Sequence, residues 1–132
     1  MGSTDRKDKG QSLVEFMLVA PLLLFLLVGI AEFSRAWMTQ SILTGAAREA
    51  VRIYAVDPAF GGGLAPAQIA ADNILASANI TGYTFAPVDD GVSFGTVTVT
   101  VSYNFPLAVV GFFAISAADI PLFSSTSMRK EY

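Results

Sequence analysis

The chain has 132 residues, of which 53% are hydrophobic and 14% charged, and its formal net charge is −3. It contains no cysteine and no histidine, which excludes disulfides, thiolate zinc sites and Ser–His–Asp or Cys–His catalytic groups. An acidic chain with eight Lys and Arg residues gives no basis for nucleic-acid binding. No polar side chains converge in the pattern of an active site, so we expect no enzyme, no cofactor, no metal and no small-molecule substrate.

The first ten residues, MGSTDRKDKG, contain the densest basic cluster of the chain, formed by Arg6, Lys7 and Lys9. Basic residues that flank a membrane span stay on the cytoplasmic side. We therefore expect residues 1–10 to be a cytoplasmic leader. The chain would cross the cytoplasmic membrane once, with its C-terminus outside.

Residues 11–31, QSLVEFMLVAPLLLFLLVGIA, form the candidate membrane span, with Glu15 as their only charge. A helix of that length covers about 30 Å, the thickness of the hydrocarbon core of a bilayer. Apolar residues fall on all sides of this helix, unlike the single stripe of a helix in a soluble domain. Pro21 lies within the span, where we expect it to kink the helix.

A carboxylate in hydrocarbon costs on the order of 2.5 kcal/mol or more unless a cation neutralises it. Gly10, Gln11, Glu15 and Phe16 stand in an order that resembles a type IV prepilin signal: a basic leader, a glycine, then a glutamate followed by an aromatic residue. The resemblance implies that a prepilin peptidase cuts between Gly10 and Gln11. The new amine would then lie about one helical turn from Glu15 and could neutralise it, in the same subunit or a neighbouring one.

Two alternatives for this segment stay open. Glu15 lies near the cytoplasmic edge and could instead snorkel to the headgroups. The segment could also be a secretory signal that is cleaved after Gly29-Ile30-Ala31. Against a secretory signal, the apolar run is slightly long and contains a carboxylate close to its start.

The helical pattern continues through residues 32–56 as an amphipathic helix, with ion pairs predicted for Glu32–Arg35 and Glu49–Arg52. An unbroken helix over residues 11–56 would have 46 residues, with Gly45 as its weakest point. Asp57-Pro58 and the glycines at 61–63 should end it. A second helix is predicted over residues 66–79, with an apolar stripe that packs on the sheet that follows.

The β pattern starts at residue 83. Strands are predicted over residues 83–88 and 96–104, with Val97, Val99 and Val101 on one face. Asp89-Asp90-Gly91 between them indicates a hairpin turn, and we prefer this to a calcium site because the other carboxylates stand at no ligand spacing. A last strand over residues 120–130 should pair with 96–104.

Residues 106–118, PLAVVGFFAISAA, are too short to span a membrane and are predicted to be a buried helix or a surface that contacts the membrane or another subunit. The candidate partner surface is formed by Val109, Val110, Phe112, Phe113 and Ile115.

Together these segments resemble the TadE-like family of pseudopilins. The resemblance is carried by L-V-E-F at 13–16, Pro21, G-I-A-E-F-S-R-A at 29–36, A-A-R-E-A-V-R at 46–52, and an ending with Met128, Arg129 and Glu131. It implies an α+β, pilin-like fold with an extracytoplasmic domain over residues 32–132. It also implies a minor subunit of a tight-adherence (Flp-type) pilus that is cleaved by prepilin peptidase and assembles with other pilin subunits. Before assembly the span would lie in membrane lipid; afterwards the subunit could be part of an extracellular pilus. The alternative function is a single-pass membrane-anchored binding module that is not assembled.

Overall fold

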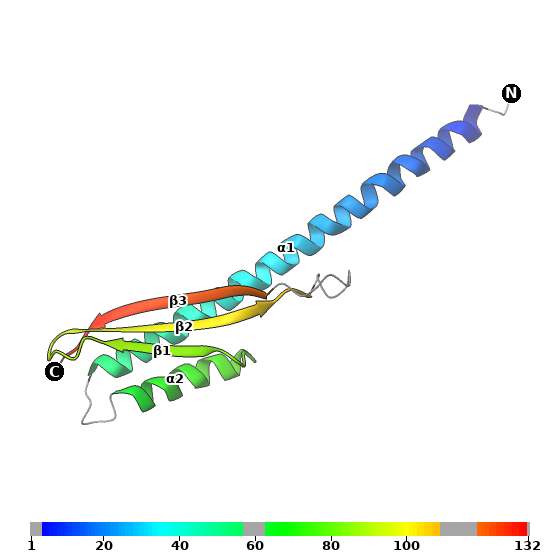
Figure 1. Cartoon of the computed structure of the whole chain (residues 1–132). Helices are drawn as coiled ribbons and strands as arrows, with labels where there is room; N and C mark the ends of the chain where they lie inside the picture. Colours follow the sequence, from blue (N-terminus) through cyan, green and yellow to red (C-terminus); the bar gives the residue numbers. More distant parts are fainter. Residues whose placement is uncertain (1–3, 57–62, 109–118, 132) are drawn as a thin grey trace. The chain divides into compact units, whose positions relative to one another are not determined.

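The structure is a computed structural model that describes residues 4–56, 63–108 and 119–131 (Figure 1). Along the chain it contains α1 (Thr4–Val56), α2 (Leu64–Ser77), β1 (Thr84–Asp89), β2 (Thr96–Pro106) and β3 (Asp119–Arg129). This confirms the α+β class, with a long N-terminal helix, a second short helix and a small antiparallel sheet. The chain divides into two compact units, Met1–Arg35 and Ala36–Tyr132, and each is described by itself.

Helix α1 has 53 residues and begins at Thr4, seven residues before the expected start at Gln11. It ends at Val56. As predicted, the helix runs without interruption through Gly45, its expected weakest point. A glycine inside a helix costs about 1 kcal/mol relative to alanine, and two strong helix formers, Ala46 and Ala47, directly follow it. The helix also continues through Pro21.

The three strands of the second unit form one antiparallel sheet in the order β1-β2-β3. The predicted pairing of the last strand with the strand that begins at Thr96 is confirmed, and the ladder runs from Thr96 opposite Arg129 to Pro106 opposite Asp119. β2 is two residues longer than expected because β3 supplies a partner as far as Asp119. β1 and β3 each lie one residue from their expected positions.

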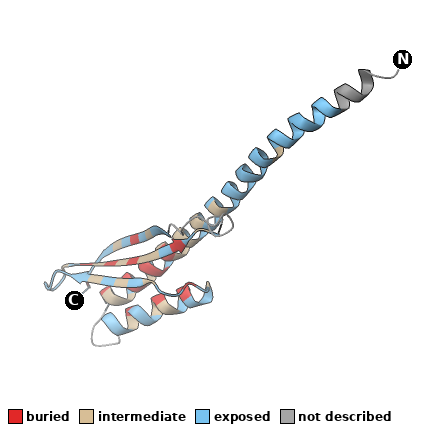
Figure 2. Ribbon diagram, turned by 45° about the vertical axis from the view of Figure 1, so that its right-hand side comes forward, coloured by how far each residue is buried: buried red, intermediate tan, exposed pale blue. Residues whose placement is uncertain are grey.

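The core of the second unit lies between the helices and one face of β2. Val97, Val99 and Val101 are fully buried, whereas Thr96 and Thr98 on the other face are exposed or half-buried. The same cluster contains buried residues of both helices, namely Leu43, Ala46, Ala47, Ala50, Val51, Ala55, Ala67, Ala71 and Leu75. Figure 2 shows these buried positions where α1 and α2 face the sheet. Alanine side chains are small, so the helical backbones can approach the branched valines closely.

Helix α2 covers Leu64–Ser77 rather than the expected 66–79. Its predicted apolar stripe is the buried one, since Ala67, Ala71 and Leu75 all belong to the core. Beyond its end, Asn79 and Gly82 both adopt positive φ angles, 57° and 75°. This left-handed backbone turns the chain into β1, and it is readily adopted by asparagine and glycine.

Two glycine substitutions test this description of α1 and of the turn. A Cβ atom at Gly45 would meet no atom within 4 Å, so Gly45→Ala should raise the free energy of unfolding by about 0.5–1 kcal/mol through the greater helix propensity of alanine. Gly82→Ala serves as the contrast, because its φ of +75° should make the same replacement cost about 1–2 kcal/mol. Chemical denaturation of the full chain in micelles would measure both. A destabilising effect of Gly45→Ala would contradict an exposed helical position.

Candidate membrane and processing segment

The first part of α1 presents apolar side chains to its surroundings on every side. All the large apolar residues between Leu13 and Ile30 are exposed, including Leu18 at 74% and Phe16 at 68%. Within the described residues, one helix is long and apolar enough to cross a membrane, and its most apolar stretch has no buried residue. A single apolar patch of this extent is unusual for a soluble monomer and indicates a contact with lipid or protein. The segment therefore has the composition of a single-pass membrane anchor.

The residues predicted for processing and assembly, Gly10, Gln11, Glu15 and Phe16, are all exposed on this part of α1. The helix places Gln11 and Glu15 one turn apart on the same face, because side chains four positions apart are neighbours. Among the residues whose side chains are described, Glu15 forms no ion pair. The helix thus presents an exposed carboxylate in its apolar surface, and cleavage before Gln11 stays a prediction.

The next charged residues along α1 mark the end of the apolar run. Arg35 Nη1 lies 2.8 Å from Glu32 Oε1, which is the predicted i,i+3 ion pair. Ser34 donates a hydrogen bond to the Ile30 carbonyl at 2.9 Å, so its hydroxyl is satisfied within the helix. Between Glu15 and Glu32 the helix carries no charge.

The candidate partner surface at Val109, Val110, Phe112, Phe113 and Ile115 lies outside the described residues.

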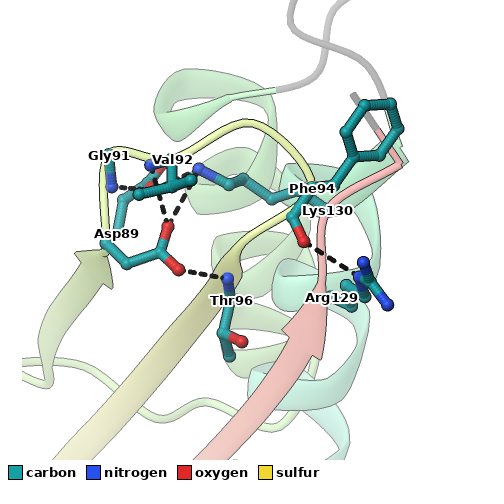
Figure 3. Close-up of polar contacts among 8 residues, drawn as sticks. Asp89, Gly91, Val92, Phe94, Thr96, Arg129 and Lys130 are labelled. Atoms are coloured by element: carbon teal, nitrogen blue, oxygen red, sulfur yellow. Dashed lines mark hydrogen bonds and ion pairs between the residues drawn. The ribbon is translucent and has the colours of Figure 1, made fainter.

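The two adjacent aspartates, by contrast, are held in a defined arrangement at the hairpin between β1 and β2 (Figure 3). Lys130 Nζ lies 2.6 Å from Asp89 Oδ1 and 3.2 Å from Asp90 Oδ1. The lysine side chain is only 4% exposed, and a buried ammonium group needs such partners. The hairpin prediction is confirmed, and a lysine of this chain occupies the position between the carboxylates.

Backbone amides complete the arrangement. The Asp90 carboxylate accepts hydrogen bonds from the amides of Val92, at 3.1 Å, and Thr96, at 2.5 Å, and these bonds lower the pKa of Asp90 to about 2. Asp89 accepts from the Gly91 amide at 2.8 Å, but its pKa is lowered chiefly by the hydrogen bond from Lys130. In turn, the bond to Asp89 raises the pKa of Lys130.

The end of β3 is tied to this hairpin and to α1. The Lys130 amide donates to the Gly95 carbonyl at 2.8 Å, and the Glu131 amide donates to the Ala55 carbonyl at 2.9 Å. Arg129 Nε also donates to the Phe94 carbonyl at 2.9 Å (Figure 3). The role of Lys130 was missed in the sequence. The signal that could have found it is the pairing of the last strand with β2, which brings the residue after β3 to the beginning of β2.

Comparison with protein families gives one result for this chain. The model of the family described as TadE-like protein matches residues 10–52. Residues 10–52 are therefore similar to the TadE-like family. The resemblance predicted from the sequence is confirmed over this segment, about a third of the chain, which includes Glu15, Pro21 and both helical ion pairs. Comparison with curated proteins and with solved structures found no match. The similarity at Met128, Arg129 and Glu131 lies outside the matched segment and stays a prediction.

The hairpin arrangement makes a prediction about pH. Because the pKa values of Asp89 and Asp90 are lowered in the folded chain, their contribution to stability is present above pH 3.8 and is lost as the pH falls through their folded pKa values, which for Asp90 is about 2. The raised pKa of Lys130 makes its contribution present below 10.5 and lost as the pH rises beyond that value.

The substitution Lys130→Met should change the pKa values of the two aspartates differently. We expect the pKa of Asp89 to return towards 3.8, while the pKa of Asp90 stays low because backbone amides are its main cause. Carbon NMR titration of the side-chain carboxyl groups in wild type and variant would measure both values. An equal rise of the two pKa values would show that Lys130, rather than the backbone, governs Asp90.

Proposed function

We propose that this chain is a minor pilin or pseudopilin of a tight-adherence type pilus, a structural subunit without enzymatic activity. The observation that supports this best is the TadE-like match on a helix whose apolar surface is exposed and contains a carboxylate. The family indicates a protein associated with such a pilus; cleavage and assembly are the finer part of the proposal.

The exposed surface of α1 suits a subunit that passes from lipid into a filament. Apolar side chains such as Leu18 and Phe16 gain little by leaving lipid tails for the apolar side chains of other helices, because both surroundings are dry. The transfer of this helix surface from lipid to a filament therefore changes its free energy little. What changes is which neighbours the helix packs against, and these would be other pilin subunits.

Glu15 gives this transfer its specificity. A carboxylate among apolar neighbours requires a cation, and prepilin peptidase would create one by cutting between Gly10 and Gln11. The new amine of Gln11 would lie one turn from Glu15 on the same helix, or close to the Glu15 of an adjacent subunit. In this proposal cleavage does more than remove the leader, because it supplies the partner that Glu15 lacks among the described side chains.

Measurement of the N-terminal mass tests the processing step. Protein from cells with an active prepilin peptidase should begin at Gln11, and protein from cells without it should retain residues 1–10. A start at Glu32 would mean that the segment is a secretory signal. An intact leader in both strains would contradict the proposal and favour a membrane-anchored binding module.

Replacement of Glu15 tests the assembly step. Glu15→Lys should still insert in the membrane, because a basic residue near the cytoplasmic end agrees with the positive-inside rule, but it should lose incorporation into filaments. Glu49→Gln is the matched control: it also removes a carboxylate of α1, but from a pair with Arg52 on the amphipathic part, and should assemble normally. Sheared filaments and membrane fractions would be probed separately. Normal incorporation of Glu15→Lys would refute a role for the charge in assembly.

A further inference from the structure

We propose that a second apolar surface, on the unit Ala36–Tyr132, rests on the lipid headgroup region while the chain is anchored. This surface, called the Trp37 lip, consists of Trp37 on α1 and Ile120, Pro121 and Phe123 at the start of β3. The proposal rests on the membrane anchor and does not require assembly into a filament.

A hydrogen bond between side chain and backbone brings the two parts of the lip together. Gln40 Nε2 donates to the Phe123 carbonyl at 2.8 Å, which joins α1 to the edge strand β3. Trp37 precedes Gln40 by three residues and therefore lies on the same side of the helix, one turn earlier.

A second hydrogen bond shows in which direction β3 runs relative to the part of α1 from Gln40 to Ala55. The Glu131 amide donates to the Ala55 carbonyl, so β3 runs in the same direction as this part of α1. From Gln40 to Ala55 the helix advances about 22 Å, and from Phe123 to Glu131 the strand advances about 26 Å, so the two elements stay level. Trp37 thus lies beside the residues that immediately precede Phe123, which include Pro121.

The lip exposes large apolar side chains. Trp37 is 69% exposed, Phe123 66% and Ile120 40%. Phe123 lies opposite Ser102 on the face turned away from the helices, whereas Ile120 lies opposite Phe105 on the other face. The lip therefore surrounds the free edge of β3. Asp119, which precedes Ile120 at the start of the strand, is charged and exposed.

The short stretch of chain between the apolar run and the Trp37 lip is the reason to propose lipid, and not another protein, as its partner. Trp37 follows Ala31, the last residue of the apolar run, by only six positions, and even a fully extended chain of that length reaches about 20 Å. The lip is thus tethered at the membrane surface, where tryptophan and other amphipathic aromatic side chains are enriched. The chain that connects Ala108 to Asp119 also contains no charged residue. The hairpin end of the same unit exposes Phe94 and Val92, but it lies beside Ala55, at the other end of this part of α1.

The chain has a single tryptophan, which makes fluorescence a direct test. The full chain is inserted in phosphatidylcholine vesicles, with and without lipids brominated near the headgroup, and aqueous iodide is the opposing quencher. In a Trp37→Phe background, Phe123→Trp reports on the lip and Phe94→Trp is the matched control at the hairpin. Both phenylalanines are exposed, 66% and 58%, so the larger side chain should be accommodated at either site. Ile120→Trp gives a second report on the lip.

We expect the tryptophan at 123 to emit at shorter wavelength, to be quenched by the brominated lipid and to be protected from iodide. The tryptophan at 94 should behave in the opposite way. Equal iodide quenching at both positions would overturn the proposal. So would protection at 123 that grows with protein density without quenching by brominated lipid, since this would identify the lip as a contact between copies. Flotation of each variant with the vesicles verifies the anchor independently.

Discussion

The second unit depends on the packing of a helix of small residues against a row of valines. Ala46, Ala47 and Ala50 of α1 belong to the same buried cluster as Val97 and Val99 of β2. The other helix and strands of this unit pack on these residues or pair with β2. α2 contributes Ala67 and Ala71 to the cluster, and β1 and β3 pair with the two edges of β2. The residues after β3 form hydrogen bonds with the hairpin and with the end of α1. The same helix carries the exposed apolar segment, so one element provides both the core and the anchor.

Charged residues are distributed differently in the two parts of α1, the exposed apolar segment and the part that packs on the sheet. In the part that packs on the sheet, charges occur in neighbouring pairs such as Glu49 and Arg52, which are satisfied within the helix. In the apolar part there is a single carboxylate, Glu15, and no basic residue follows it until Arg35. The carboxylate of Glu49 is neutralised by a cation of the same helix. Among the described side chains Glu15 has no such pairing, which distinguishes the apolar part of the helix from the part that packs on the sheet.

Much of this fold could be predicted because its signals are local. The alternation of valine and threonine from Thr96 onward shows which face of β2 is buried, and the spacing of Ala67, Ala71 and Leu75 shows the same for α2. The long helix was also predicted, including its continuity through Gly45, although not its start at Thr4. Helix propensity is weak and is outweighed by packing on both sides of a glycine. Glu15 could be singled out because a charge in an apolar run needs a reason.

What could not be predicted depends on residues far apart in the chain. Lys130 meets Asp89 and Asp90 only because β3 pairs with β2 in one particular register. Gln40 meets the Phe123 carbonyl across 83 positions of sequence. Neither side chain belongs to a periodic pattern, so neither contact could be inferred from spacing. The hairpin at the two aspartates was predicted, with Asp89 as the last residue of β1 and Asp90 in the turn, but the lysine that pairs with them comes from a position about 40 residues later in the sequence.

The shared direction of β3 and the second half of α1 has a mechanical consequence. Hydrogen bonds between antiparallel strands lie perpendicular to the strands. Tension applied along this part of α1 and resisted at the sheet would act along the strands and load the ladder between Thr96 and Pro106 in shear. Many hydrogen bonds would then carry the force together, whereas peeling from one end would break them one after another.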